Sequence, residues 1–290
     1  MDRPIVAGVD GSEHSLRAVD LAADEAALRR APLKVVYGSL WERYEGAALA
    51  QDLGRPSGQV TGEHILASAV QRARRRQDGL RVSAESVPEE PEYALIRESR
   101  FAAAVVVGSR GRGGLAEALL GSVATTVAGR AHGPVIVVRA GPGDRTGSGT
   151  RGRIVVGVGE KPADSAAVRF ALDEARLRGV PLDVVRAWRT PALASADSPL
   201  FADEPARLYA QLADEAVEEA LRQAPADVRV HRHTVEGPAR RVLAEFSDGA
   251  DLLVVGARQR DGHFGLRLGR VAHGVLHHAA CPVAVVPQPG

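Results

Sequence analysis

The chain repeats itself with an offset of just under 150 residues, and this duplication limits how it can fold more than any other feature. The segment IVAGVD at residues 5–10 returns as IVVGVG at residues 154–159, and GPVIVV at 133–138 returns as CPVAVV at 281–286. A repeat of this length far exceeds the units of roughly 20–45 residues that stack into solenoids, and it is long enough to form its own core. The sequence therefore predicts two similar domains in tandem.

The two copies are separated by a stretch that cannot bury apolar surface. Residues 141–152 read GPGDRTGSGTRG. Gly, Ser and Thr in such density are typical of flexible linkers. We therefore expect a first domain at residues 1–140, a linker at 141–152 and a second domain at 153–290.

The composition narrows the class of protein. Hydrophobic residues make up 45% of the chain but aromatic residues only 4%, so the cores must be built from small and branched aliphatic side chains, which favours α/β layering. Lys and Arg number 37 against 36 Asp and Glu, a formal net charge of +1. With no bulk field to attract nucleic acid or an anionic membrane, we expect neither as a partner.

The compartment is indicated by cysteine usage and by the start of the chain. Cys281 is the single cysteine, which excludes an intramolecular disulfide and suits a reducing compartment. The opening MDRPIVAGVDGSEHS carries acidic residues early and only a short apolar run, unlike a signal peptide. No apolar stretch approaches the roughly 18 residues that a membrane span requires. We expect a cytoplasmic protein.

Short apolar runs alternate with longer amphipathic stretches in each copy. In the first copy, we expect strands at Val6–Val9, Leu33–Val36, Ala103–Val107 and Val135–Val138, an edge strand at Arg81–Val87, and helices at Ser15–Arg30, Glu63–Arg76, Pro91–Phe101 and Leu119–Arg130. In the second copy, we expect strands at Ile154–Val158, Leu182–Ala187, Val228–Val235, Leu252–Val255 and Val283–Val286, and a loop at Thr190–Pro205.

This alternation predicts two doubly wound domains, each with a five-stranded parallel sheet flanked by helices. Parallel neighbours need right-handed crossovers, and these place helices on both faces of the sheet. Ligands of such sheets bind at the carboxyl ends of the strands, near the point where the strand order reverses.

A glycine-rich loop follows the fourth expected strand of the first copy. Gly108, Gly111 and Gly121 punctuate it, and Ser122 begins the next helix. Backbone amides without a Cβ in the way approach phosphate oxygens closely, and a helix start adds unpaired N–H groups. Arg110 would add a charged contact. The alternative is an ordinary glycine-rich turn in which Ser122 is a simple N-cap.

The spacing of these residues resembles a known motif. Gly108, two residues, Gly111, nine residues and Gly121-Ser122 fill every position of G-x2-G-x9-G-[ST], the nucleotide motif of the universal stress protein family. The opening VDGS with Ser15 and the ending HHAACPVAVV at 277–286 are similar to the family's first turn and last strand. The resemblance implies an adenine nucleotide alpha hydrolase-like fold in tandem, as in actinobacterial members.

The resemblance also implies an ATP site in the first copy. Asp10 would contact the ribose or a bound Mg²⁺, and Gly38 the adenine. A turn-forming aspartate is the alternative interpretation of Asp10. The full set of implied nucleotide contacts is Gly8, Asp10, Gly38, Val107, Gly108, Arg110, Gly111, Gly121, Ser122 and Val123.

The second copy departs from the motif. Gln259 stands in place of the second glycine, Arg270 in place of the serine and Gly159 in place of Asp10. A glutamine side chain would obstruct a phosphate where a bare backbone is needed. We therefore expect weak or no ATP binding by the second domain, with a structural role or a different ligand as alternatives.

Two groups of polar residues have simpler interpretations. The basic run Arg72–Arg76 is typical of an exposed helix end, with a partner-binding patch as the alternative. His231 and His233 alternate along an expected strand and so would share a solvated face.

The resemblance implies a nucleotide-binding regulatory protein of the stress response. Occupancy by ATP would alter a conformation or an assembly that a protein partner reads, and pairing of the domains, within the chain or in a homodimer, stays open. A slow ATPase or adenylating enzyme and a nucleotide-free interaction module are the alternatives. An adenylating relative would carry Ser-Gly-Gly after the first strand, where this chain has Asp10-Gly11-Ser12. Since no catalytic triad stands out either, we do not expect an enzyme.

Overall fold

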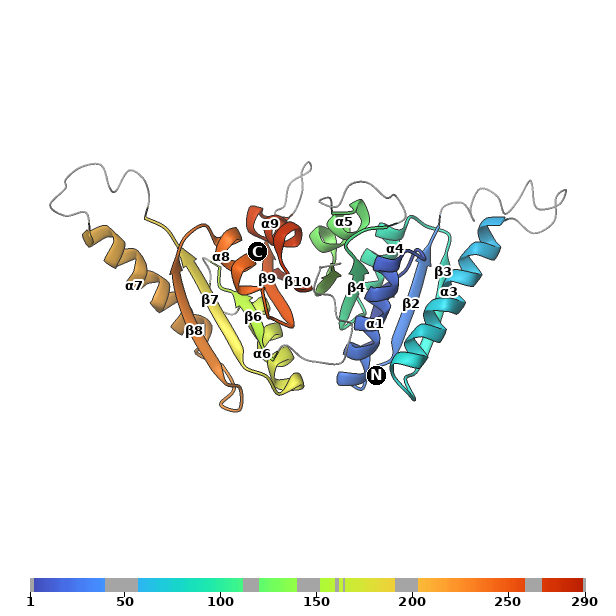
Figure 1. The fold of residues 1–290 in the computed structure, drawn as a ribbon, viewed down its shortest axis with the longest axis horizontal. Coiled ribbons are helices and arrows are strands. Elements are labelled where there is room, and N and C mark those ends of the chain that lie inside the picture. Colours follow the sequence, from blue (N-terminus) through green and yellow to red (C-terminus); the bar gives the residue numbers. More distant parts are fainter. Residues whose placement is uncertain are drawn as a thin grey trace. The chain divides into compact units, whose positions relative to one another are not determined.

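A computed structural model describes residues 3–39, 57–111, 120–139, 152–159, 162–163, 165–190, 203–258 and 268–288. These residues form two compact units, the first built from residues before the predicted linker and the second from residues after it; Figure 1 shows the elements of each. The linker itself lies outside the described residues, apart from Gly152.

The first unit is a parallel sheet with the strand order β3-β2-β1-β4-β5. Helices α1 and α3 pack together on one face of the sheet, and α4 and α5 on the other. Its elements are β1 (Ile5–Gly8), α1 (Glu13–Leu28), β2 (Leu33–Gly38), α3 (Ser57–Arg76), β3 (Val82–Val87), α4 (Pro91–Glu98), β4 (Ala104–Gly108), α5 (Ser122–Arg130) and β5 (Val135–Val138).

The second unit repeats this plan with the strand order β10-β9-β6-β7-β8, again parallel throughout. Helices α8 and α9 pack together, as α4 and α5 do in the first unit. Its elements are β6 (Ile154–Gly157), α6 (Ala166–Arg178), β7 (Leu182–Trp188), α7 (Asp203–Ala220), β8 (Val230–Glu236), α8 (Ala239–Phe246), β9 (Leu252–Arg258), α9 (Arg270–His278) and β10 (Val283–Gln288). The predicted fold class, with helices on parallel sheets in two tandem copies, is confirmed.

The cores are aliphatic, as the composition predicts. All four residues of β1 and of β5 are buried, and α1 faces the sheet with alanines such as Ala18, Ala22 and Ala26, whose small side chains let the helix approach closely. β3 is the expected edge strand: it pairs with β2, and only its last residue is buried. No helix among the described residues is long and apolar enough to cross a membrane.

Helix starts differ from the prediction where the apolar period is weak. α3 begins at Ser57, six residues before the expected Glu63, because its first turn carries no apolar repeat to reveal it. α5 begins at Ser122 rather than Leu119, since Gly121 is the N-cap with an extended backbone. The loop predicted up to Pro205 is wrong at its end, where α7 has already begun at Asp203; residues 191–202 lie outside the described residues.

The strand order fixes where a ligand of the first unit would bind. β1 lies between β2 and β4, so the crossovers that leave β1 and β4 cover opposite faces of the sheet. The carboxyl ends of these two strands therefore border the crevice in which doubly wound sheets bind ligands.

Candidate functional site

Asp10 and Gly111 lie against each other at this crevice, although they are far apart in sequence. A Cβ added to Gly111 would lie 2.6 Å from Oδ2 of Asp10. Gly111 therefore provides the space that the Asp10 carboxylate occupies. The structure thus brings together two of the residues predicted to bind the nucleotide.

Asp10 also shapes the turn after β1. Its Oδ1 accepts hydrogen bonds from the backbone N–H of Ser12 at 2.9 Å and from the Ser12 hydroxyl at 2.6 Å. The Ser15 hydroxyl accepts a hydrogen bond from the Asp10 N–H at 3.3 Å. The turn-forming role is therefore present, and it aims the second carboxylate oxygen at Gly111. The predicted contact of Asp10 with ribose or Mg²⁺ stays a prediction.

Gly108 lets the start of α1 approach the end of β4. A Cβ on Gly108 would lie 2.7 Å from both the carbonyl carbon and the oxygen of His14. Ser12 caps this helix, because its hydroxyl accepts a hydrogen bond from the Ser15 N–H. The helix N-terminus and the buried Val107 strand end are thereby held side by side.

The start of α5 is tied back to the end of β4. The Gly121 N–H donates a hydrogen bond of 2.8 Å to the Ser109 carbonyl, and the first intrahelical bond runs from the Thr125 N–H to the Gly121 carbonyl. The N–H groups of Ser122 and Val123 belong to the first turn, where no helix offers an intrahelical partner, and Gly121 provides no side chain to cap them. This arrangement suits an anion.

Packing against α4 explains why glycine stands at positions 8 and 38. A Cβ on Gly8 would lie 2.7 Å from Cδ1 of Leu95 on α4, and one on Gly38 would lie 2.7 Å from Cα of Pro91 at the start of that helix. Both glycines therefore let α4 lie close to the sheet. Their predicted contacts with the nucleotide stay predictions.

Three basic side chains, those of His14, Arg110 and Arg139, influence one another near this edge, and two of them, His14 and Arg139, were missed from the sequence. Burial, followed by the charges of Arg110 and Arg17, lowers the pKa of His14. Burial, followed by the charge of Arg110, lowers the pKa of Arg139. Arg139 follows β5 directly, but only the register of β5 beside β4 reveals that it lies near Arg110.

The number of acidic side chains at this edge of the sheet limits which metal ion the site could hold. Among the described residues, no three His, Cys, Asp or Glu side chains are placed to hold an ion. Mg²⁺ in nucleotide sites is bound through one or two carboxylates together with phosphate oxygens. Asp10 fits that role only in company with a phosphate ligand.

Comparison with known proteins identifies the family. The model of the universal stress protein family matches residues 1–139 and again residues 150–287. The chain belongs to the universal stress protein family. A universal stress protein of Mycobacterium tuberculosis (strain ATCC 25618 / H37Rv) is 33% identical over 302 residues, which cover 98% of this chain and 97% of the relative.

Other relatives agree over the full length. A universal stress protein of Mycolicibacterium smegmatis is 31% identical over 290 residues, which cover 97% of this chain and 96% of the relative. The crystal structure of a universal stress protein from Archaeoglobus fulgidus matches with a TM-score of 0.68 and 17% identity, over 98% of this chain and 96% of that one. This last likeness concerns the fold.

The second universal stress protein repeat fills the equivalent edge with its own side chains. A Cβ on Gly256, the counterpart of Gly108, would lie 2.8 Å from Nε2 of Gln288. Oε1 of Gln288 accepts a hydrogen bond of 3.1 Å from the Ala166 N–H at the start of α6, and Arg186 donates one of 3.0 Å to the Val158 carbonyl.

The second repeat has other residues at the positions of the motif. Gly159 stands exposed where the first repeat has Asp10, and Arg270 is exposed at the start of α9. Gln259 lies outside the described residues. The expected weak binding of ATP here stays a prediction.

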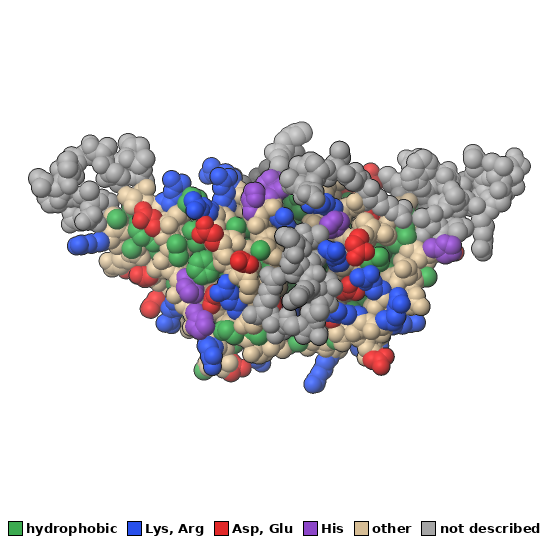
Figure 2. Space-filling model, viewed as in Figure 1, with side chains coloured by type: hydrophobic (Ala, Val, Ile, Leu, Met, Phe, Trp, Pro, Cys, Tyr) green, Lys and Arg blue, Asp and Glu red, His purple; other side chains and the backbone are tan. Residues whose placement is uncertain are grey.

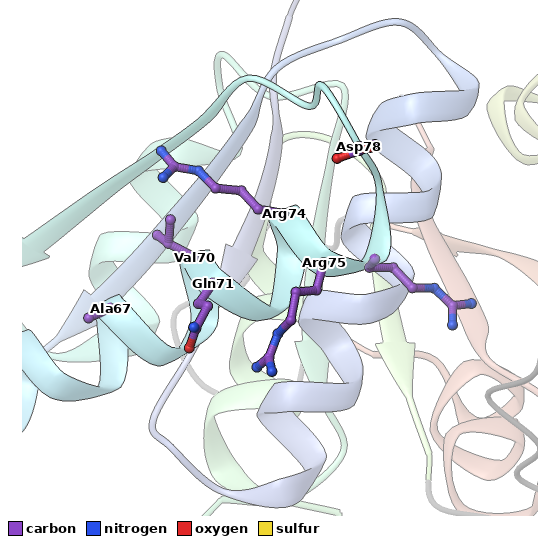
Figure 3. Close-up of a pocket in the computed structure, with 7 residues that line it drawn as sticks. Ala67, Val70, Gln71, Arg74, Arg75 and Asp78 are labelled. Carbon is purple, nitrogen blue, oxygen red and sulfur yellow. The ribbon is translucent and has the colours of Figure 1, made fainter.

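A surface hollow of about 690 Å³ lies elsewhere on the first universal stress protein repeat (Figure 3). It is lined by α3 and the turn that follows it, through Ala67, Val70, Gln71, Arg74, Arg75, Arg76 and Asp78. The lining comes from the second half of α3 and the turn after it, and one lining residue, Arg76, also contacts Asp24 on α1. It includes none of the residues of the candidate nucleotide site, so the hollow is separate from that site.

Proposed function

We propose that the first unit binds ATP together with Mg²⁺. We further propose that the chain is a regulatory protein of the stress response, which signals through whether its nucleotide site is occupied. One observation carries the proposal: Asp10, the glycine edge of β4 and the N-terminus of α5 converge at the switch point of the sheet. Family membership supports it, because this chain fills every position of the family's nucleotide motif.

The residues have distinct parts in this proposal. The N–H groups of Ser122 and Val123 would donate to phosphate oxygens, since the helix dipole favours negative charge there. Arg110 would add a charge-assisted hydrogen bond. Asp10 would hold Mg²⁺, which when bound offsets the charge of the phosphates.

Binding rather than turnover suits the arrangement of Asp10. A hydrolytic base must lie within hydrogen-bond reach of the attacking water. One oxygen of Asp10 accepts two hydrogen bonds from Ser12, which commits that oxygen to the turn. Occupancy would then be read by a protein partner or a second copy of the chain. We place this function in the cytoplasm, because the buried thiol of Cys281, which forms no disulfide, suits a reducing compartment.

Released small molecules and calorimetry test the proposal. The purified full chain is denatured, the supernatant is analysed by mass spectrometry, and ATP binding to nucleotide-free protein is titrated with Mg²⁺ present. We expect an adenine nucleotide and a single site per chain. A protein that releases no nucleotide and gives no binding heat overturns the proposal. An assay for phosphate release separates a binder from an ATPase.

A matched pair of variants locates the site. Gly121 and Gly269 are equivalent N-caps with nearly the same backbone, φ −65° and ψ 151° against φ −63° and ψ 157°. Gly121→Val should abolish binding, because the side chain would stand where the phosphates approach. Gly269→Val should leave binding unchanged. The opposite pattern places the nucleotide in the second unit.

A further inference from the structure

The helices α3 and α7 occupy equivalent places in the two units, because each follows the second strand of its unit and precedes the third. Their solvent-facing sides carry opposite charge. In the second half of α3, the exposed charged residues are Arg74 and Arg75. In the second half of α7, they are Asp214, Glu215 and Glu218. The two helices therefore offer charges of opposite sign to a partner.

The hollow on α3 combines this positive charge with an apolar surface. Ala67 and Val70 line it together with Arg74 and Arg75, whose side chains extend from the helix in different directions (Figure 3). Asp78, in the turn after α3, is the single acidic residue of the lining. The hollow therefore favours a partner whose surface is partly apolar and partly acidic.

The solvent-facing side of α7 has this character. Leu208 and Leu212 are 55% and 48% exposed, and they share one face of the helix because they are four residues apart. Glu215 continues this face three residues later, and Glu218 follows after three more. Figure 2 shows hydrophobic and acidic side chains at the surface along α7. A single exposed leucine is ordinary, but this adjacent pair leads directly into acidic residues.

The spacing of the two surfaces matches when the helices lie side by side and run in the same direction. With Leu212 beside Val70, the two glutamates that follow it fall at the levels of residues 73 and 76. The two exposed arginines of α3 lie between these levels, within one helical turn of about 5.4 Å. The leucine would then cover the apolar part of the hollow, while opposite charges meet next to it.

We infer that the hollow on α3 binds α7 of a second copy of the chain. Every copy carries both surfaces, so the chain itself supplies a partner with the required chemistry. Because the two surfaces differ, a contact between two copies either is returned in a closed dimer or continues into a longer assembly. None of the residues involved belongs to the proposed nucleotide site, so this assembly goes beyond that function.

Analytical ultracentrifugation of the full chain tests this contact by reversing charge. Arg74→Glu with Arg75→Glu makes both surfaces acidic, and Glu215→Arg with Glu218→Arg makes both basic. Each double variant should associate at least about tenfold more weakly than the wild type, because like charges then face each other. An equimolar mixture of the two double variants should associate as strongly as the wild type, because each contact then joins opposite charges again.

Two control substitutions separate this contact from general effects of charge and hydrophobicity. Arg100→Glu with Arg130→Glu reverses two exposed charges next to the ends of α4 and α5, on the other face of the sheet, and should leave association unchanged. Leu212→Gln should weaken association several-fold, because it removes the apolar part of the contact. Leu177→Gln, at a leucine of α6 that is 39% exposed, should not.

Each result supports or overturns the contact. A wild-type chain that stays monomeric at every concentration overturns it. A mixture that associates no better than its two components also overturns it, as do double variants that associate as strongly as the wild type. If a double variant does not fold, the comparison of Leu212→Gln with Leu177→Gln decides, and equal association of these two overturns the contact. All of these outcomes leave the proposed nucleotide site standing.

Discussion

Arg72 on α3 donates two hydrogen bonds to the Asp20 carboxylate on α1, from Nε at 2.7 Å and from Nη2 at 2.6 Å. One turn later, Arg76 repeats the contact with Asp24, at 2.9 Å and 2.8 Å. The two helices are therefore joined by a ladder of bidentate ion pairs. The basic run predicted to be an exposed helix end is divided, because Arg74 and Arg75 face solvent while Arg72 and Arg76 face α1.

Removal of Arg72 should destabilise the first unit. The Asp20 side chain is only 11% exposed, so Arg72→Met leaves a mostly buried carboxylate without its bidentate partner. We expect the free energy of unfolding to fall by about 2 kcal/mol, measured by urea denaturation. The control Arg74→Met removes an equal charge from the exposed side of α3 and should change it by less than about 0.5 kcal/mol. Equal effects of the two substitutions would contradict the ladder.

The two units carry ion clusters of opposite sign at equivalent positions. Lys34, the second residue of β2, contacts Glu85 at 2.8 Å and Glu98 at 2.7 Å. Asp183, the second residue of β7, contacts Arg153 at 3.0 Å and Nδ1 of His231 at 2.9 Å. The central charge is inverted while its place in the sheet is kept.

Neutralising Asp183 should therefore cost stability in the second unit. Its side chain is 3% exposed, and Asp183→Asn would leave the Arg153 guanidinium without its carboxylate. We expect Asp183→Asn to lower the free energy of unfolding by about 2 kcal/mol, as measured by scanning calorimetry. The exposed pair of Arg176 and Asp227, 3.6 Å apart and 61% and 62% exposed, supplies the control. Asp227→Asn should be nearly neutral, and a comparable loss there would argue against a special role for Asp183.

The sequence predicts best those features that depend on residues close together along the chain. The strand Val135–Val138 is predicted to the residue, because a buried parallel strand is a short continuous apolar run. The interpretation of His231 and His233 as a solvated strand face is incomplete. His231 contacts Asp183, and the His233 ring packs 4.9 Å from that of Phe246. These partners come from other elements, so no local pattern reveals them.

The candidate site shows the same division. The glycine spacing predicts the edge at which Asp10 and Gly111 meet, since strand ends and a helix start are local signals. It does not reveal that Gly8 is covered by Leu95 on α4, nor that Arg139 lies at the same edge as Arg110. Both depend on which strands and helices become neighbours.

Two neighbouring glycines should respond differently to substitution by alanine. Gly108→Ala places a Cβ 2.7 Å from backbone atoms of His14, which cannot move without shifting α1, and overpacking of this kind costs about 1–3 kcal/mol. Gly111→Ala meets the end of the Asp10 side chain instead. We expect it to leave the thermal midpoint nearly unchanged and to weaken ATP binding at least tenfold, because the displaced carboxylate would occupy the ligand's space.

Gly159→Ala is the control for both substitutions, since among the described residues, its chain neighbours aside, no atom lies within 4 Å of the added Cβ. It should affect neither stability nor ATP binding. Calorimetric binding and thermal unfolding of the three variants separate the two roles. A large stability loss in Gly111→Ala, or none in Gly108→Ala, would contradict the packing described above.

Acid should destabilise the first unit through His14. Burial and the charges of Arg110 and Arg17 lower the pKa of His14 from its ordinary value of 6.5, so the unfolded chain binds more protons than the folded one below that pH. Stability then falls as the pH decreases from 6.5 towards the lowered folded value. His14→Gln cannot be protonated, so its thermal midpoint should fall less between pH 7.5 and 5.5 than that of the wild type. His64→Gln, which removes an exposed imidazole from α3, is the control, and parallel curves for wild type and His14→Gln would refute the effect.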